Sequence, residues 1–311
     1  MTEPAPAATP RPVVNGILVV AKAPGPTSHD IVALIRRLTG VRRVGHGGTL
    51  DPFAAGVLPV FVGHATRLVE YHLRDDKEYR ALVAFGARST TDDLDGELTP
   101  TGSAPTREQV EEALASFRGE IEQIPPDYSA VRVAGRKAYE LARHGEKPEL
   151  RPRRVTIHRF ELTDWDGADP ARPVVSVDVR CSAGTYIRSL ARDLGERLGS
   201  GAHLAALTRT ASGPFMLDMA RPLEEVRSTL ADGRAAELML PMDTGLEGYP
   251  VLTVGEQDVA SLARGQQLRR ARDTIADGLV RVVDESGRLV AIARATGGLI
   301  KPEKVFVTAA G

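Results

Sequence analysis

The stretch GHGGTLDPFAAGVLP, residues 45–59, places one carboxylate between a glycine-rich turn and a proline. Gly47 and Gly48 permit a tight backbone turn, and Pro52 disfavours helix at Asp51. The backbone is therefore expected to aim the Asp51 carboxylate in one direction. Because the sequence has no second carboxylate and no His or Cys at ligand spacing nearby, the local chemistry suggests a nucleophile or general base without a metal. Asp and Gly are also ordinary turn residues, so an Asp that only braces a turn fits the stretch at least as well.

The composition is that of an ordinary globular protein. The chain has 311 residues, enough for roughly two domains. Its 42% hydrophobic and 26% charged residues argue against a disordered or a membrane protein, and no apolar run is long enough to span a bilayer. The single cysteine, Cys181, excludes an intramolecular disulfide and a cysteine zinc cluster. Residues 1–12, with four prolines, are expected to form a disordered tail and not a signal peptide. A soluble cytoplasmic protein is predicted.

The charge distribution is uneven along the chain. The formal net charge is −1, which argues against a uniformly basic nucleic-acid coat. Residues 132–159, however, contain nine Arg or Lys against three Glu, an excess of six positive charges. Such a segment suits a phosphate backbone, and it suits a solvated charged loop equally well.

The N-terminal part of the chain predicts a strand and a helix. Residues 16–20 form a short apolar run typical of a strand, which a Pro-Gly-Pro turn follows. Thr27 or Ser28 is then expected to cap a helix, since apolar residues between 31 and 38 recur at helical spacing and Gly40 provides the end.

The middle of the chain alternates between strand and helix patterns. Residues 78–85 and 174–181 show the alternation of half-buried strands, and Thr106 opens a helix through a capping box. A turn after the second strand leads into another helix closed by a glycine, with Tyr186 and Arg188 in its first turn. Side chains at such a strand end commonly reach a cleft, although helix capping explains most cases.

The last sixty or so residues predict a separate small unit. Residues 245–250 have the composition of a linker. A short helix is expected at 256–263, and the runs at 279–283 and 288–294 flank a hairpin turn. This unit is expected to be barrel-like.

Several motifs occur in an order that is characteristic of one family. Besides residues 45–59, they are KAPGPTS at 22–28, DKEYR at 76–80, QIPPDYSA at 123–130, AYELAR at 138–143, GTYIR at 184–188, GAHL at 201–204 and LTR at 207–209. Together they resemble the TruB type of bacterial tRNA pseudouridine synthase. Members of that family isomerise the T-loop uridine at tRNA position 55.

The resemblance implies a fold and a domain layout. The expected fold is α+β, with a mixed, mainly antiparallel sheet flanked by helices and a small β-rich PUA-like domain at the C-terminus. Residues 13–244 would form the catalytic domain, with an insertion at about 127–159 that clamps RNA. Residues 249–311 would form the PUA-like RNA-binding domain.

The resemblance also implies the catalytic residues. Asp51 would be the catalytic carboxylate, and Arg188 the cation that compensates its charge. Tyr79 would lie against the target base and help proton transfer at C5. Whether Asp51 attacks the ribose C1′, adds to the uracil C6 or acts as a base at C2′ stays open. No redox or phosphoryl step occurs, so neither a cofactor nor a metal is expected.

Five further residues are implied to bind the substrate, as Tyr79 would too. His46 would support the base stack after the uridine flips out, and Tyr186 and Leu207 would line the uracil pocket. Lys22 and Arg209 match positions near the site, where a structural role and an RNA contact are both plausible.

Four positions depart from the usual family pattern. They are Ala23, where a proline is usual, Gly47 for a threonine, Thr90 for a frequent aspartate and Arg132 for a lysine. The departures at Gly47 and Arg132 would affect fine contacts with RNA. The Asp, Tyr and Arg implied in catalysis are all present.

The expected partner is the T-arm of tRNA, bound by a monomer without a membrane or an obligate protein partner. Two alternatives remain from the sequence. One is a tRNA-binding folding chaperone that performs no chemistry, and the other is a pseudouridine synthase that depends on a guide RNA.

Overall fold

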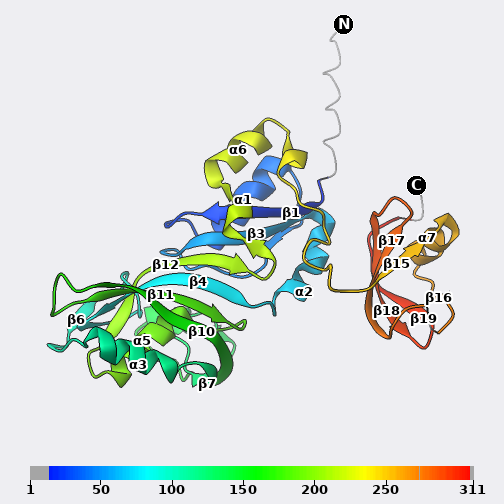
Figure 1. Cartoon of the computed structure of the whole chain (residues 1–311). Helices are drawn as coiled ribbons and strands as arrows, with labels where there is room; N and C mark the ends of the chain where they lie inside the picture. Colours follow the sequence, from blue (N-terminus) through cyan, green and yellow to red (C-terminus); the bar gives the residue numbers. More distant parts are fainter. Residues whose placement is uncertain (1–13, 273, 309–311) are drawn as a thin grey trace, which may run out of the picture.

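The computed structural model describes residues 14–272 and 274–308 of the chain (Figure 1). One large sheet with helices at both ends makes up most of it, and a smaller sheet forms a second unit toward the C-terminus. The tail expected at 1–12 lies outside the described residues.

The large sheet has the strand order β14-β1-β3-β12-β4-β11-β10-β7, with β2 paired to β3 and β13 paired to β12. The strands are β1 (Gly16–Lys22), β2 (Val44–His46), β3 (Ala55–Val62), β4 (Lys77–Phe85), β7 (Gly119–Gln123), β10 (Arg153–Asp166), β11 (Val174–Cys181), β12 (Ala202–Ser212), β13 (Phe215–Met216) and β14 (Arg221–Pro222). Within the described residues, only the β1–β14 and β3–β12 pairs of this sheet are parallel. The sheet is therefore mixed and mainly antiparallel.

Two groups of helices lie at opposite ends of this sheet (Figure 1). α1 (Ser28–Thr39) and α6 (Leu223–Ala231) pack together near β1, and α3 (Arg107–Ala115) and α5 (Ile187–Arg197) pack near β10 and β12. The shorter elements are η1 (Gly63–Leu68), α2 (Val69–His72), β5 (Ala87–Ser89), β6 (Leu98–Pro100), η2 (Leu217–Met219) and η3 (Ala235–Glu237). One cluster of buried apolar side chains joins both groups through the sheet.

Local sequence signals explain where α1 begins and ends. The Thr27 hydroxyl accepts a hydrogen bond from the Asp30 N–H, and the Asp30 carboxylate accepts one from the Thr27 N–H, which is a capping box. Gly40 ends the helix in the left-handed region at φ 71°. The predicted helix is thus confirmed with both of its ends.

The other predicted elements of this part are also present. The strand patterns at 16–20, 78–85 and 174–181 correspond to β1, β4 and β11, the last with the predicted bounds. Thr106 caps α3 through the predicted box, and Tyr186 is the N-cap of α5, which places Arg188 in the first turn.

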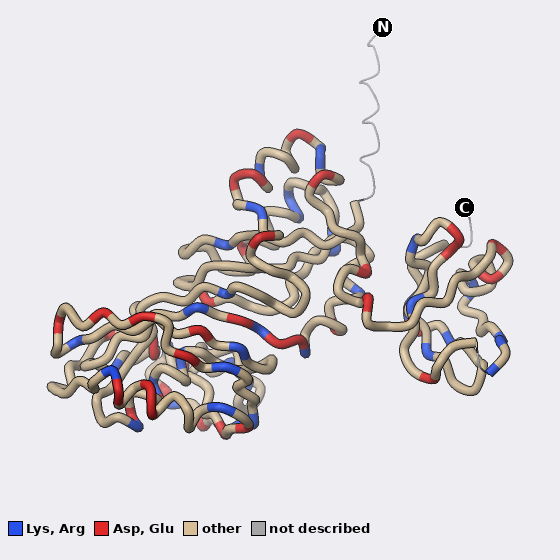
Figure 2. The backbone as a smooth tube through the Cα atoms, viewed as in Figure 1, with Lys and Arg blue, Asp and Glu red and all other residues tan. Residues whose placement is uncertain are grey.

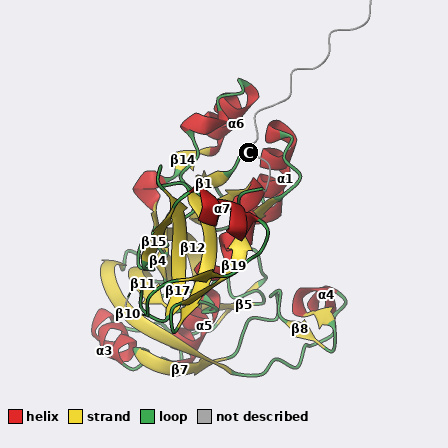
Figure 3. Cartoon of the chain, turned by 90° about the vertical axis from the view of Figure 1, so that its right-hand side faces the viewer, coloured by secondary structure: helices red, strands yellow, loops and turns green. Residues whose placement is uncertain are grey.

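The basic insertion stands away from the sheet as a small hairpin and helix (Figure 3). It contains β8 (Arg132–Val133), β9 (Arg136–Lys137) and α4 (Ala138–Arg143). The hairpin turn consists of Ala134 at φ 49° and Gly135 at φ 85°. Two positive φ values in a two-residue turn are typical of type I′, which favours Asn-Gly and strains an alanine.

The C-terminal unit has its own sheet and core. Its elements are β15 (Val251–Val254), α7 (Glu256–Ala263), β16 (Leu268–Arg269), β17 (Gly278–Asp284), β18 (Leu289–Thr296) and β19 (Leu299–Val305), in the sheet order β15-β17-β18-β19-β16. The predicted helix at 256–263 and the β17–β18 hairpin are confirmed. Buried Leu68 and Leu246 pack against Leu289 and Ile292, so an apolar contact joins the two units.

The predicted α+β class is therefore confirmed, with a helix-flanked, mainly antiparallel sheet and a small β-rich C-terminal unit. In the described part of the chain, the helices are too short or too polar to cross a membrane. The predicted domain boundaries at 244 and 249 remain predictions.

The turn of the insertion provides a test of local strain. Ala134→Asn should stabilise the hairpin by up to about 1 kcal/mol, because asparagine adopts the left-handed region more readily than alanine. Hydrogen exchange of the amides at 132–137 should slow accordingly. Gly135→Ala is the matched control: it meets no neighbouring atom, so only backbone strain acts, and exchange should accelerate. Unchanged exchange in both variants would show that the turn is not strained.

Candidate active site

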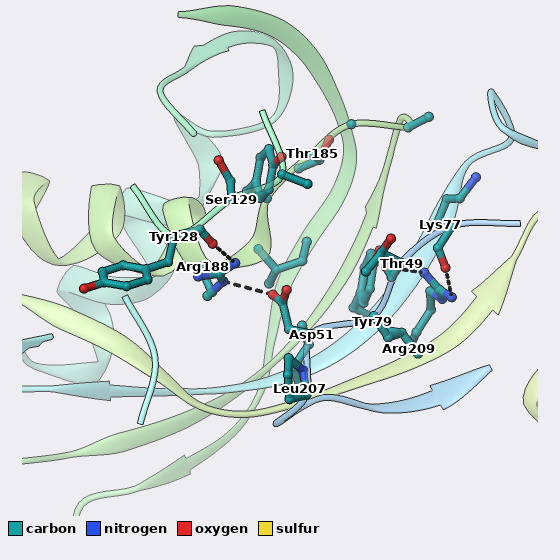
Figure 4. A pocket seen from close by; sticks show the side chains of 18 of the residues that line it. Thr49, Asp51, Lys77, Tyr79, Tyr128, Ser129, Thr185, Arg188, Leu207 and Arg209 are labelled. Carbon is teal, nitrogen blue, oxygen red and sulfur yellow. Dashed lines mark hydrogen bonds and ion pairs between the residues drawn. The ribbon is translucent and has the colours of Figure 1, made fainter. Parts of the chain in front are cut away.

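A cleft of about 530 Å³ opens where the loop at 47–52 meets β4, β12 and the turn before α5 (Figure 4). Tyr139 and Arg143 of the insertion contribute to its lining. Six of the eight predicted site residues line it, namely Asp51, Tyr79, Tyr186, Arg188, Leu207 and Arg209. Lys22 and His46 lie beside it. Residues separated by more than 150 positions thus meet at one site.

Buried side chains hold the main chain of the Asp51 loop. The Lys22 Nζ donates hydrogen bonds to the carbonyl oxygens of Ala23, Pro52 and Ala54 at 3.1, 3.1 and 2.6 Å. These three bonds use every N–H of an ammonium group. Lys22 is 2% exposed, so its contacts favour the structural one of its two expected roles.

Arg209 holds the same loop from the other side. Its Nε donates to the carbonyl of Val57 at 2.8 Å, and its two Nη atoms donate to the carbonyls of Thr49 and Gly48 at 3.3 and 3.1 Å. The side chain is 1% exposed. Here too the contacts favour the structural role, although Arg209 also forms part of the wall of the cleft.

Two more contacts restrict the loop. The Ser28 hydroxyl accepts a hydrogen bond from the Leu50 N–H at 2.9 Å. Gly56 has φ 106°, and a Cβ there would lie 2.1 Å from the carbonyl oxygen of Arg209, so only glycine fits. With its main chain held in this way, the loop directs the Asp51 side chain into the cleft (Figure 4).

Arg188 lies between two carboxylates. Its Nε is 3.0 Å from Asp51 Oδ2, and its Nη1 is 3.5 Å from Asp93 Oδ2. The two Nη atoms also donate to the carbonyls of Thr91 and Tyr128 at 3.1 and 3.0 Å. The side chains of Arg188 and Asp93 are 5% and 6% exposed, whereas that of Asp51 is 36% exposed. Arg188 is thus fixed by two carbonyls and the Asp93 carboxylate, and the Asp51 side chain remains accessible from the cleft.

Asp93 is a site residue that sequence reasoning missed. The Thr91 hydroxyl and the Asp95 N–H donate to its Oδ1. Burial raises the pKa of the Asp93 carboxyl, while the bond from Thr91 and the charge of Arg188 act in the opposite direction. The only signal in the sequence is an acidic turn before Gly96, and many surface turns share that pattern.

Tyr79 lies on the other side of Asp51 from Arg188 (Figure 4). It projects from β4 and packs against the apolar core. Burial raises the pKa of the Tyr79 phenol, and the charge of Arg209 only partly offsets this. The phenol is therefore protonated at neutral pH and able to donate.

Tyr186 is held by a buried amide for which no role was predicted. The Tyr186 N–H donates to Gln123 Oε1 at 2.8 Å, and Gln123 Nε2 donates to the Tyr186 carbonyl at 3.0 Å. Gln123 is fully buried. The Arg153 guanidinium lies over the Tyr186 ring, 5.6 Å from its centre, which restricts the ring further.

Leu207 and His46 complete the predicted set. Leu207 projects from β12 and lines the floor of the cleft. His46 ends β2, and its Nδ1 accepts a hydrogen bond from the Gly48 N–H at 3.3 Å. Burial and the charge of Arg209 lower the pKa of His46, so the ring is neutral at pH 7. The insertion of His46 into RNA remains a prediction.

Across the described residues, no three His, Cys, Asp or Glu side chains come together as a set able to hold a metal ion. The groups that meet at the cleft are a partly exposed carboxylate, an arginine behind it and a protonated tyrosine. Such a set can perform nucleophilic or acid–base chemistry. With the α+β fold, it defines a candidate enzyme site centred on the Asp51 carboxylate.

The chain belongs to the TruB family of pseudouridylate synthases. Residues 36–187 match the model of the TruB family N-terminal domain. Residues 188–247 match the tRNA pseudouridylate synthase B C-terminal domain, and residues 249–307 match the tRNA pseudouridine synthase II C-terminal domain.

Individual proteins give the same result. A tRNA pseudouridine synthase B of Symbiobacterium thermophilum is 50% identical over 81% of this chain and 82% of its own length. That of Thiobacillus denitrificans is 44% identical over 96% of this chain and 98% of its own. Among solved structures, an H/ACA RNP bound to a substrate RNA containing 2′-deoxyuridine matches with TM-score 0.71 and 28% identity, covering 95% of this chain and 86% of that one.

Raising the pH should loosen the Asp51 loop. Burial lowers the pKa of Lys22 to about 8, although the charge of Asp51 acts in the opposite direction. A neutral amine has two N–H bonds for three carbonyls, so the rate of pseudouridine formation should fall as the pH rises through 8. Deprotonation of Lys22 acts in the opposite direction on the free energy of unfolding, which it raises. Unfolded lysine titrates at about 10.4, so the unfolded state binds more protons between pH 8 and 10 and folding becomes more favourable there.

Lys22→Met tests this account. The rate at pH 7 should fall about tenfold because the loop moves, and the decline above pH 8 should disappear. Lys301→Met, which removes an exposed lysine of β19, serves as the control and should change neither. Persistence of the alkaline decline in Lys22→Met would assign it to another group.

Proposed function

We propose that this protein converts uridine 55 in the T-loop of tRNA to pseudouridine. The observation that supports this most directly is the Asp51–Arg188 ion pair, set in a cleft with Tyr79 and Leu207. The membership of the TruB family and relatives named tRNA pseudouridine synthase B support the tRNA substrate.

The reaction breaks the bond between ribose C1′ and uracil N1, turns the base and joins C1′ to C5, from which a proton leaves. Asp51 supplies the carboxylate by attack at C1′, by addition at C6 or as a base at C2′. Each of these routes needs the ionised form, and the Arg188 guanidinium at 3.0 Å stabilises that negative charge. Tyr79, protonated at neutral pH, packs against the base and takes part in the proton transfer at C5.

The target uridine reaches Asp51 by flipping out of the T-arm, at a cost of a few kcal/mol. Tyr186 and Leu207 then enclose the base, since both line the cleft. His46 lies next in sequence to Gly47, which lines the same cleft, and in our proposal it supports the vacated stack.

The basic insertion contacts the phosphates of the T-arm. Figure 2 shows that basic and acidic residues are interspersed along most of the chain. Beside the cleft, however, four arginines line a groove that shares Ala183 and Gly184 with it, namely Arg132, Arg151, Arg153 and Arg154. Among the described residues, only Arg154 of these four has an acidic partner, Glu120 at 3.5 Å. Binding is therefore expected to weaken with salt.

Dependence on a guide RNA is the second candidate, because solved H/ACA complexes match this chain over most of its length. The basic insertion favours direct recognition of tRNA by a monomer. The C-terminal unit adds an RNA contact in this proposal.

Mapping pseudouridine in an unmodified tRNA transcript, after reaction with the purified protein alone, tests the proposal. Pseudouridine at position 55 is the expected result. Pseudouridine at another position would show that uridine 55 is not the target. A strict requirement for a guide RNA would favour the second candidate. Binding without any product would favour the folding chaperone.

Asp51→Asn separates chemistry from binding. The variant keeps the shape of the side chain and loses its charge, so turnover should be abolished while tRNA affinity stays within a few-fold. His46→Ala should slow flipping and spare some product. Substantial activity of Asp51→Asn would remove Asp51 from its assigned role.

A further inference from the structure

Helix α5 carries a second arginine that reaches the same two loops as Arg188. Arg192 follows one helical turn later, and its Nη1 lies 2.9 Å from Asp92 Oδ2. Its Nη2 donates to the carbonyl of Ile124 at 2.8 Å, and the Ser189 hydroxyl donates to that same carbonyl at 2.8 Å. Arg192 thus joins the loop at 91–93 to the segment at 124–128.

Arg188 depends on these two loops. The carbonyls of Thr91 and Tyr128, together with the carboxylate of Asp93, hold it where its Nε meets Asp51. Asp92 lies between Thr91 and Asp93 in the chain. Any shift at Asp92 therefore displaces two of the groups that fix Arg188. Neither Asp92 nor Arg192 lines the cleft, so both act on the site only through Arg188.

Asp92 is unfavourable in two respects, its backbone conformation and the burial of its charged carboxylate. Its φ is 62°, in the left-handed region, where its carbonyl accepts a hydrogen bond from the Leu204 N–H at 3.0 Å. Burial raises the pKa of the Asp92 carboxyl to about 6, even though the charges of Arg192 and Arg188 oppose the shift. A group whose folded pKa lies above its unfolded value of about 3.9 costs stability when ionised, so the charge at Asp92 does not serve the stability of the fold. Strained, desolvated groups of this kind cluster at functional sites.

We propose that the Asp92–Arg192 ion pair is a positioning pair, which fixes the two loops that hold Arg188 against Asp51. This inference rests on the proposed function.

The test is a comparison of two asparagine variants. Asp92→Asn keeps an oxygen for Arg192 and tolerates the left-handed region. Asp193→Asn is the matched control, because Asp193 lies on α5 itself and, among the described residues, its carboxylate pairs with Arg192 at 2.9 Å and with no residue of the loop at 91–93. Single-turnover rates with saturating enzyme, measured as tritium released from a tRNA transcript labelled at uracil C5, isolate the chemical step.

Asp92→Asn should lower this rate about tenfold, since misplacing a catalytic group by about 1 Å has effects of that order or larger. Its tRNA affinity should stay within about twofold, and its melting temperature should be unchanged or higher. Asp193→Asn should keep the rate within about twofold. Arg192→Lys should recover part of the rate lost in Arg192→Met, because one ammonium still reaches Asp92.

The pH profile supplies an independent measurement. The rate of the natural protein should fall as the pH is lowered through 6, where Asp92 is protonated, and Asp92→Asn should lack this decline. The charged groups of α5 that face Asp92 are Arg188, Arg192 and Asp193, and Asp93 follows it on its own loop. On β12, which donates to the Asp92 carbonyl, the titratable group is His203, near Asp93. The pH profile of Asp193→Asn shows whether the decline comes instead from Asp193, the other carboxyl beside Arg192.

Two results would overturn the positioning pair. One is an Asp92→Asn rate equal to that of the natural protein, and the other is a loss of rate only in proportion to a loss of melting temperature. Failure of the proposed function gives a different outcome, because the natural protein would then form no pseudouridine in the transcript.

Discussion

The site depends on one constraint, which is that the carbonyl groups of the Asp51 loop are satisfied by buried cations. Lys22 and Arg209 donate six hydrogen bonds to main-chain oxygens, five of them on residues 48–57. Buried cations without partners are costly, and so are buried carbonyls without donors. Each hydrogen bond from a cation to a carbonyl removes the cost of burying both groups, so the loop has one low-energy arrangement.

A second consequence follows for Arg188. Because the loop is fixed, the position of the Asp51 carboxylate is set before substrate arrives, and the arginine only has to meet it. Arg188 does so from a helix whose N-terminal end is anchored by the Gln123 amide at Tyr186. The contact between Arg188 and Asp51 is therefore made between two elements that are each held by buried polar groups, so little reorganisation remains for the proposed reaction.

The sequence allowed the regular elements and most of the site to be predicted. Capping residues such as Thr27 and Thr106 and the alternation at 174–181 are local signals, so α1, α3 and β11 followed from them. The motifs around Asp51 and Arg188 pointed to residues that the fold brings together. Asp93 could not be found in this way, because its role arises from a contact with α5 across nearly one hundred positions. The carbonyl contacts of Lys22 were equally invisible, since a sequence does not show which main-chain oxygens are buried.

The junction between the two units has a consequence for how the molecule can be divided. Arg67 donates to the carbonyl of Val305 and lies over the Phe306 ring, and Glu70 pairs with Lys304. A few residues further along the same segment, Leu73 and Lys77 already line the cleft. A chain shortened before the C-terminal unit would lose more than that unit. It would expose the side of Leu68 that packs against Leu289 and Ile292, and it would release the segment that leads into the wall of the cleft.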